Sequence, residues 1–198
     1  MTPMRLSVSR RAAVCLSLAS FAAACTSPNP LLYTLATTPG AERRGAPKVI
    51  ELRTIGLARY LERSQIVRSS EDFRLDVLGN EWWGEPLDAM LSRVLSQNLS
   101  QRLPGTTIFA ENGAVTAVPD GMLGVNIQRM DQARNGAVML IAQVSVTRRE
   151  TTARTITIQV TPGGSGTPSL VAAMSEAVGQ LADQVAGMLG GELTGDRG

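Results

Sequence analysis

A stripe of large apolar side chains between residues 85 and 103 constrains the fold of this chain more than any other feature. The stripe recurs at three- and four-residue intervals and comprises Leu87, Met90, Leu91, Val94, Leu95, Leu99 and Leu103. This spacing places all of them on one face of an α-helix, which we expect over Glu85–Leu103. Pro86 suits the first helical position, and Pro104-Gly105 stops the helix. Such a helix usually covers a sheet, although the stripe could also be an interaction surface.

Apolar residues that alternate along the chain predict the strands of that sheet. Short strand-like runs occupy residues 31–35, 48–55, 65–69, 73–78 and 106–110. Longer runs are marked by Leu123, Val125 and Ile127, by alternate residues from Val138 to Val146, and by Ile156, Ile158 and Val160. Asn135-Gly136 is a preferred tight hairpin turn and joins the first two longer runs. A second amphipathic helix is predicted from Pro168 to about Leu189.

The order of these elements predicts an α+β fold, with a largely antiparallel or mixed β-sheet covered by two main amphipathic helices. We expect a single domain over residues 31–190, which includes a loop at residues 36–47. Gly190-Gly191 ends the last helix, so residues 191–198 are predicted to be a disordered tail.

The first 24 residues have the pattern of a bacterial secretory signal. Arg5, Arg10 and Arg11 precede the apolar residues 12–21, and Ala22-Ala23-Ala24 leads directly into Cys25. The apolar run is too short to remain as a membrane-spanning helix. A cysteine at the first mature position resembles a lipobox, so we expect residues 1–24 to be a lipoprotein signal peptide and residues 25–30 a lipidated tether. The alternative is an ordinary signal peptide in which Cys25 has no special role.

Composition excludes several classes of function for the mature chain. The leader holds three of the 19 basic residues and none of the 17 acidic ones, which leaves 16 basic and 17 acidic residues. This balance gives no electrostatic basis for binding nucleic acid. The chain has no histidine, so Ser-His-Asp triads and the common zinc sites are excluded. We therefore predict a protein that is not an enzyme and that needs no cofactor or metal.

Four local patterns occur in an order typical of one protein family. They are Tyr33-x-Leu35 after the tether, YLERSQIV at residues 60–67, Trp83-Gly84-Glu85-Pro86-Leu87 at the start of the long helix, and the strand 122–130 followed by Asp131. In this order they resemble the auxiliary lipoprotein component of ABC-type transport systems, the PqiC-like family. The resemblance covers nearly all of the mature chain.

The resemblance implies a non-catalytic lipoprotein on the periplasmic face of the outer membrane. Such a protein works with an MCE-domain protein, a permease and an ATPase that move phospholipid or other apolar molecules across the envelope. A lipoprotein that supports assembly of an outer-membrane protein or envelope complex is the alternative. Thr26 and Ser27 agree with the outer membrane, because retention in the inner membrane typically requires aspartate after the lipidated cysteine.

The best local source of partner contacts is the segment that holds Tyr60 and Leu61, together with Trp82 and Trp83. Aromatic residues are common anchors of protein interfaces, but they also fill small cores. Adjacent residues of an extended chain face opposite sides. We therefore expect one tryptophan in the core and the other partly exposed.

Acylation of Cys25 is directly testable. Mass spectrometry of the N-terminal peptide from the native host should show a diacylglycerol-type addition on Cys25, and an unmodified thiol would contradict the lipobox interpretation. Because two or more acyl chains bind a membrane far more stably than one, Cys25→Ala should release the domain from the membrane fraction.

Overall fold

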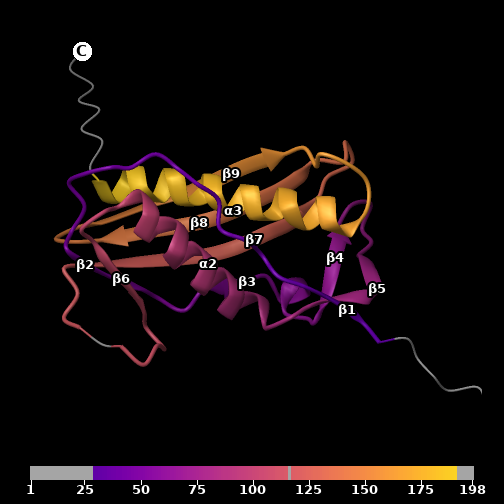
Figure 1. Cartoon of the computed structure of the whole chain (residues 1–198). Helices are drawn as coiled ribbons and strands as arrows, with labels where there is room; N and C mark the ends of the chain where they lie inside the picture. The colour runs from indigo at the N-terminus through magenta and orange to yellow at the C-terminus, as the bar shows by residue number, and fades with distance from the viewer. Residues whose placement is uncertain (1–28, 116, 191–198) are drawn as a thin grey trace, which may run out of the picture. The chain divides into compact units, whose positions relative to one another are not determined.

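The strand β7 (Gly121–Gln132) organises the sheet (Figure 1). The computed structural model describes residues 29–115 and 117–190. Along one edge, β7 pairs antiparallel with β8 (Val138–Thr147), and β8 pairs antiparallel with β9 (Thr151–Val160). Alternate residues of β7 and β8 are buried, because successive side chains of a strand point to opposite faces. The three strands therefore present one apolar face to the core.

The other edge of β7 is followed in parallel by three short strands. These are β2 (Val49–Leu52), β3 (Gly56–Leu57) and β4 (Gln65–Ser69), which pair with β7 one after another. A short 3-10 helix, η1 (Arg59–Leu61), lies between β3 and β4. The chain from residue 49 to residue 69 thus runs alongside the whole length of β7.

Three further strands complete a nine-stranded sheet. β6 (Thr107–Ala110) pairs parallel with β2, and β5 (Asp76–Trp83) pairs antiparallel with β4. β1 (Leu31–Tyr33) pairs parallel with β5. The sheet is mixed and the described residues from Leu31 onward form one unit, which confirms the predicted α+β class.

Two helices, α2 (Leu87–Arg102) and α3 (Thr167–Gly190), cover the apolar face of the sheet (Figure 1). α3 lies on β8 and β9 and contacts α2, which in turn contacts β6. Every member of the predicted stripe from Leu87 to Leu103 is buried. This stripe therefore belongs to the core, as predicted, and is not a free interaction surface.

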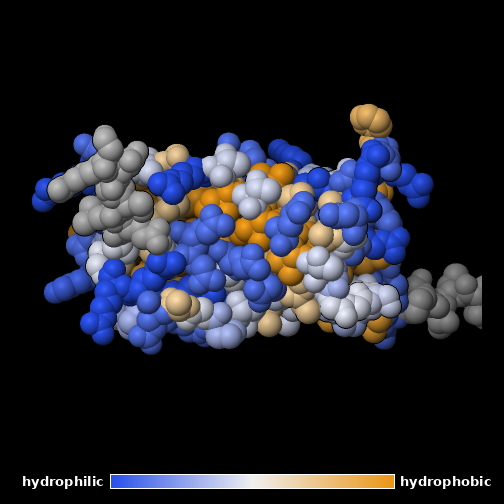
Figure 2. All heavy atoms as spheres, turned by 90° about the horizontal axis from the view of Figure 1, so that it is seen from above, coloured by the Kyte–Doolittle hydropathy of each residue, from blue (hydrophilic) through white to orange (hydrophobic). Residues whose placement is uncertain are grey.

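The α3 helix is apolar on most of its circumference. Seen from above, where α3 and β9 lie, hydrophobic residues form a band between hydrophilic margins (Figure 2). The apolar surface of α3 is wider than the single stripe of an ordinary amphipathic helix. The reason is that α3 contacts three neighbours, namely the sheet, α2 and a segment of extended chain. That segment, residues 34–46, is called the strap.

The strap corresponds to the predicted loop, and it has no regular structure but a fixed course over both helices (Figure 1). Three of its backbone amides donate hydrogen bonds to side chains of the helices. Leu35 N donates to Met90 Sδ (3.2 Å), Ala36 N to Ser175 Oγ (3.1 Å) and Thr38 N to Asn98 Oδ1 (2.9 Å). Because buried amides need partners, these contacts determine where the strap can lie.

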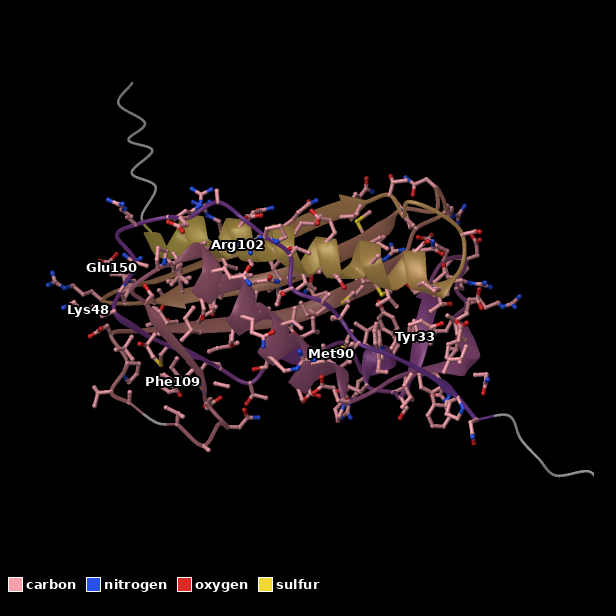
Figure 3. All side chains as sticks on the ribbon, viewed as in Figure 1. Tyr33, Lys48, Met90, Arg102, Phe109 and Glu150 are labelled. Carbon is pink, nitrogen blue, oxygen red and sulfur yellow. The ribbon has the colours of Figure 1, made fainter. Side chains whose placement is uncertain are left out.

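Arg102 at the end of α2 fixes the strap most strongly (Figure 3). Its side chain is 1% exposed and its Nε donates to Asp183 Oδ1 of α3 at 2.6 Å. The same guanidinium donates to the carbonyl oxygens of Thr38 (3.0 Å) and Pro39 (3.2 Å). One buried cation thus joins α2, α3 and the strap.

Several predicted boundaries were wrong. The strand predicted at 73–78 is β5 at 76–83, because Asp72 and Phe73 adopt positive φ angles and form a turn instead. Within the run predicted at 48–55 only β2 at 49–52 forms, and β3 begins just after the run, at Gly56. β9 begins at Thr151, five residues before the first inward apolar residue, since its exposed first half is held by the ladder to β8.

Two predicted turn and cap assignments also need correction. Pro86 is the N-cap of α2, with ψ at 134°, and is not its first helical residue. The β7–β8 connection is not a two-residue turn, because Ala133 N donates to Ala137 O and Gly136 N to Ala133 O. Gly136 at φ 79° provides the left-handed residue that three-residue hairpin loops require.

The burial of α2 gives a stability prediction. Leu95→Asp would place an unpaired charge in the core and should lower the free energy of unfolding by several kcal/mol. Gln97→Asp, on the exposed face of the same helix, is the matched control and should cost less than about 1 kcal/mol. Denaturant unfolding measures both. An unchanged stability of Leu95→Asp would contradict the core position.

Candidate functional site

Three of the family-like segments meet at one end of the sheet, around β1, β4 and β5, and the Asp131 end of the fourth is joined to them through Tyr60. The β1–β5 register pairs Tyr33 with Trp83, and Gly84 N donates to Tyr33 O at 2.8 Å. Trp83 N donates to Ser64 O at 2.7 Å, which connects the third segment to the second. Figure 3 places Tyr33 at this end of the molecule. We call this region the motif junction.

A cleft of about 780 Å³ opens beside the motif junction. Its apolar walls come from β3 and from the segment that enters α2, and they comprise Ile55, Leu57, Trp83, Pro86 and Leu87. Charged residues stand around these walls, namely Glu62, Arg63, Glu85 and Asp88. Apolar walls with a charged rim suit an apolar anchor of a partner, because the rim remains solvated while the walls are desolvated. We call this feature the motif cleft.

The structure separates the four residues that the sequence singled out for partner contact. Leu61 and Trp83 are buried in the core, at 3% and 7% exposure. Trp82 is half-buried and its Nε1 donates to Gly79 O at 3.2 Å. The prediction of one core and one partly exposed tryptophan is therefore confirmed. Trp82 pairs with Leu32 of β1, whose side chain is exposed.

Tyr60 contributes to a polar cluster behind the motif junction. Its hydroxyl donates to Asp131 Oδ2 at 2.8 Å, and Ser70 Oγ donates to the same oxygen at 2.7 Å. Arg129 Nε donates to Asp131 Oδ1 at 2.8 Å, and Arg129 Nη2 donates to Glu71 Oε1 at 2.6 Å. Asp131 is fully buried, so these three donors compensate the cost of removing its charge from water.

The surroundings of this cluster shift the ionisation of its members. Burial raises the pKa of Tyr60, and the charge of Asp131 raises it further, so the hydroxyl remains a hydrogen-bond donor. The hydrogen bond from Arg129 lowers the pKa of Glu71. The hydrogen bonds to Glu71 and Asp131 outweigh desolvation and raise the pKa of Arg129. Each shift strengthens the existing pairing, as expected of a structural network.

Sequence reasoning noted Asp131 but missed Ser70, Glu71 and Arg129 as its neighbours. The sequence contains one sign of this irregularity. Inward apolar residues alternate at Leu123, Val125 and Ile127, but the next one is Met130 and not residue 129, so the alternation slips by one residue. The register of β7 against β8 shifts between Ile127 and Arg129, as at a β-bulge. A bulge turns side chains to new directions and here directs Arg129 towards Asp131.

The part of the chain that the structure describes brings together no candidate metal-binding group. Between residues 29 and 190, position 116 aside, there is no group of three or more His, Cys, Asp or Glu side chains that could hold a metal. Cys25, the tether up to residue 28 and the tail at 191–198 lie outside the described residues. None of the helices described is long and apolar enough to cross a membrane.

Comparison with known proteins agrees with these observations. Residues 33–186 match the family model described as ABC-type transport auxiliary lipoprotein component. No curated protein matches the chain significantly. Among solved structures, a protein described only as uncharacterized has a TM-score of 0.68 at 19% identity, covering 80% of this chain and 97% of its own. Protein XCC0632 from Xanthomonas campestris, of the DUF330 family, has a TM-score of 0.65 at 16% identity, covering 81% and 94%. At these identities the two structures support the fold alone.

The polar cluster gives a second stability prediction. Asp131→Asn keeps the shape of the side chain but removes its charge, and should cost about 1–3 kcal/mol because a buried donor loses its acceptor. Tyr60→Phe removes one hydrogen bond and should cost about 0.5–1.5 kcal/mol. Equal stabilities of wild type and Asp131→Asn in denaturant unfolding would contradict the network.

Proposed function

Because this chain belongs to the family of ABC-type transport auxiliary lipoprotein components, we propose that it is a non-catalytic outer-membrane lipoprotein that docks a trans-envelope transporter. Its partner would be an MCE-domain protein, which works with a permease and an ATPase to move phospholipid or other apolar molecules. The lipid anchor on Cys25 would hold the domain on the periplasmic face of the outer membrane. Membership of the family supports a role in ABC-type transport. The outer-membrane location, the MCE-domain partner and the apolar cargo are what we propose.

One observation carries the docking role. Three segments that resemble the family meet at the motif junction, the fourth is joined to them by the Tyr60–Asp131 hydrogen bond, and the second and third also line an open cleft. A docking site needs apolar anchors within a polar rim, and the motif cleft has both. Leu32 adds exposed apolar area on β1, beside the half-buried Trp82 of β5.

Two features of the sequence support the remaining parts. Thr26 and Ser27 follow Cys25 without an aspartate, in agreement with transfer to the outer membrane. The carboxylates of the polar cluster are committed to arginines, which agrees with a docking role and not with general acid–base chemistry. The mature chain also has a charge near zero, so docking would depend on apolar contact more than on electrostatic steering.

An assembly factor for an outer-membrane protein is the second candidate, since an apolar cleft with a charged rim would suit that role as well. The two candidates predict different partners. Neighbouring genes for a permease, an ATPase and an MCE-domain protein would favour transport, whereas a neighbouring gene for an outer-membrane barrel would favour assembly.

Affinity purification from the native envelope, with the lipid anchor retained, tests the proposal. Wild-type protein should recover an MCE-domain protein or its permease. Trp82→Ala should weaken that recovery with a loss of about 2 kcal/mol if Trp82 is an anchor, which corresponds to roughly 30-fold in Kd. Val118→Ala, at an exposed residue between β6 and β7, is the matched control and should leave recovery unchanged.

The thermal unfolding midpoint of each variant shows whether a loss of binding comes from a loss of folding. Trp82→Ala should unfold close to wild type, because its side chain lies outside the buried core. Repeated recovery of an outer-membrane barrel, and of no transporter component, would overturn the transport role in favour of assembly.

A further inference from the structure

The turn between β4 and β5 presents a phenylalanine entirely to solvent. Phe73 has a relative exposure of 110%, and Leu75 beside it is 41% exposed. Asp72 and Phe73 have φ angles of 56° and 60°. Left-handed conformations are uncommon for side chains other than glycine, asparagine and aspartate, and two in succession cost stability. We call residues 71–75 the aromatic tip.

Ion pairs hold the aromatic tip in this conformation. Glu71 pairs with Arg129 and Arg134, and Asp72 pairs with Arg134. At the base of the turn, Arg68 Nε donates to Asp76 Oδ2 at 2.7 Å. The acidic side chains of the turn are thus all paired with arginines, while Arg74 is exposed. The tip consequently offers an apolar ring, a free basic residue and no unpaired carboxylate.

Folding does not account for Phe73. A fully exposed ring gains nothing from burial, and glycine would adopt the same φ without strain. A residue that breaks local rules without stabilising the fold is expected to serve a function. The ring is therefore available to an apolar environment outside this domain.

The short tether limits how far the domain can lie from a bilayer that holds acyl chains on Cys25. β1 runs parallel to β5 and starts opposite Glu81, five residues from Asp76 at the base of the tip. Five residues of strand span about 17 Å. The six residues 25–30 span at most about 20 Å when extended. A bilayer that holds acyl chains on Cys25 therefore lies within reach of the tip.

We propose that the aromatic tip is a second, non-covalent membrane contact, in which Phe73 inserts at the interface of the bilayer that carries the lipid anchor. The inference rests on the proposed function, because it assumes that Cys25 is acylated. Aromatic rings favour the membrane–water interface, and Arg74 can remain at the headgroups while Phe73 and Leu75 enter. Anchoring makes the contact intramolecular, so a weak interaction is enough to orient the domain.

Depth-dependent fluorescence quenching tests this contact. Acylated full-length protein with Phe73→Cys would carry an environment-sensitive fluorophore, in vesicles of phosphatidylethanolamine and phosphatidylglycerol that contain spin-labelled lipid. Val118→Cys, 89% exposed, is the matched control. The probe at position 73 should be quenched several-fold more than the probe at position 118. Equal quenching at the two positions would overturn the inference.

Hydrogen exchange provides a readout that needs no probe. On the same vesicles, amides of residues 70–75 should exchange more slowly in wild type and in Phe73→Leu than in Phe73→Ser. Phe73→Ser should not lower the thermal unfolding midpoint, since the ring contacts no core, so a folding defect cannot imitate the result. Identical exchange in wild type and Phe73→Ser would also overturn the inference.

Partner recovery separates this inference from the proposed function. If Phe73→Ser recovers the transporter partner normally and loses protection on vesicles, the tip contacts membrane. If position 73 is not quenched and Phe73→Ser loses the partner, the tip is a protein contact, and the inference fails while the docking role stands. An unmodified Cys25 in mass spectrometry would remove both the anchor and the membrane contact.

Discussion

The buried guanidinium of Arg102 is the interaction on which the arrangement of the helices and the strap depends. It binds a carboxylate of α3 and two carbonyl oxygens of the strap from the last turn of α2. A buried charge is tolerated only when its hydrogen-bonding groups are satisfied, so these partners cannot move independently. The strap connects β1 to β2, and its fixed course therefore also places β1 on β5, where the motif junction forms.

Close approach of the strap depends on glycines that no periodic pattern reveals. A Cβ on Gly179 of α3 would lie 1.8 Å from Thr38 Oγ1, and a Cβ on Gly40 would lie 2.2 Å from the guanidinium carbon of Arg102. Glycine within a helix costs stability compared with alanine. At Gly179 that cost is accepted because a Cβ would clash with the side chain of Thr38 in the strap, whereas composition alone indicated only a loop.

The parts of the fold that sequence could predict are those with local periodicity. The stripe from Leu87 to Leu103 and the alternation from Val138 to Val146 depend on spacing within one element, and both are buried as expected. Contacts between distant segments are different. Asn98 and Arg102 lie on the same helix face as the apolar stripe but are polar. Polar residues on a buried face indicate buried hydrogen bonds. Their partners in the strap, however, are known only from the tertiary structure.

The candidate site shows the same division. The sequence identified the tryptophans and the tyrosine segment, because aromatic residues and family-like order are visible in one dimension. The cleft, the bulge that directs Arg129 and the exposed position of Phe73 arise from strand register and from φ angles, which spacing does not encode. Sequence reasoning accordingly placed Phe73 in a strand, although the structure gives it the most exposed position among the large hydrophobic residues described.

The β4–β5 pair connects the two proposed contacts geometrically. Gln65 and Trp82 stand at its motif-junction end, and Ser69 and Asp76 stand at the base of the aromatic tip. A five-residue strand such as β4 is about 16 Å long, so a tip at the bilayer surface would hold the motif cleft roughly that far above it. On the proposed anchoring at Cys25, the six residues 25–30 would span at most about 20 Å when extended, which is enough for this orientation. Insertion of Phe73 would thus fix the direction in which the motif cleft faces a partner. Because the anchor already holds the domain at the membrane, this contact would contribute to docking even if it were too weak to bind the membrane alone.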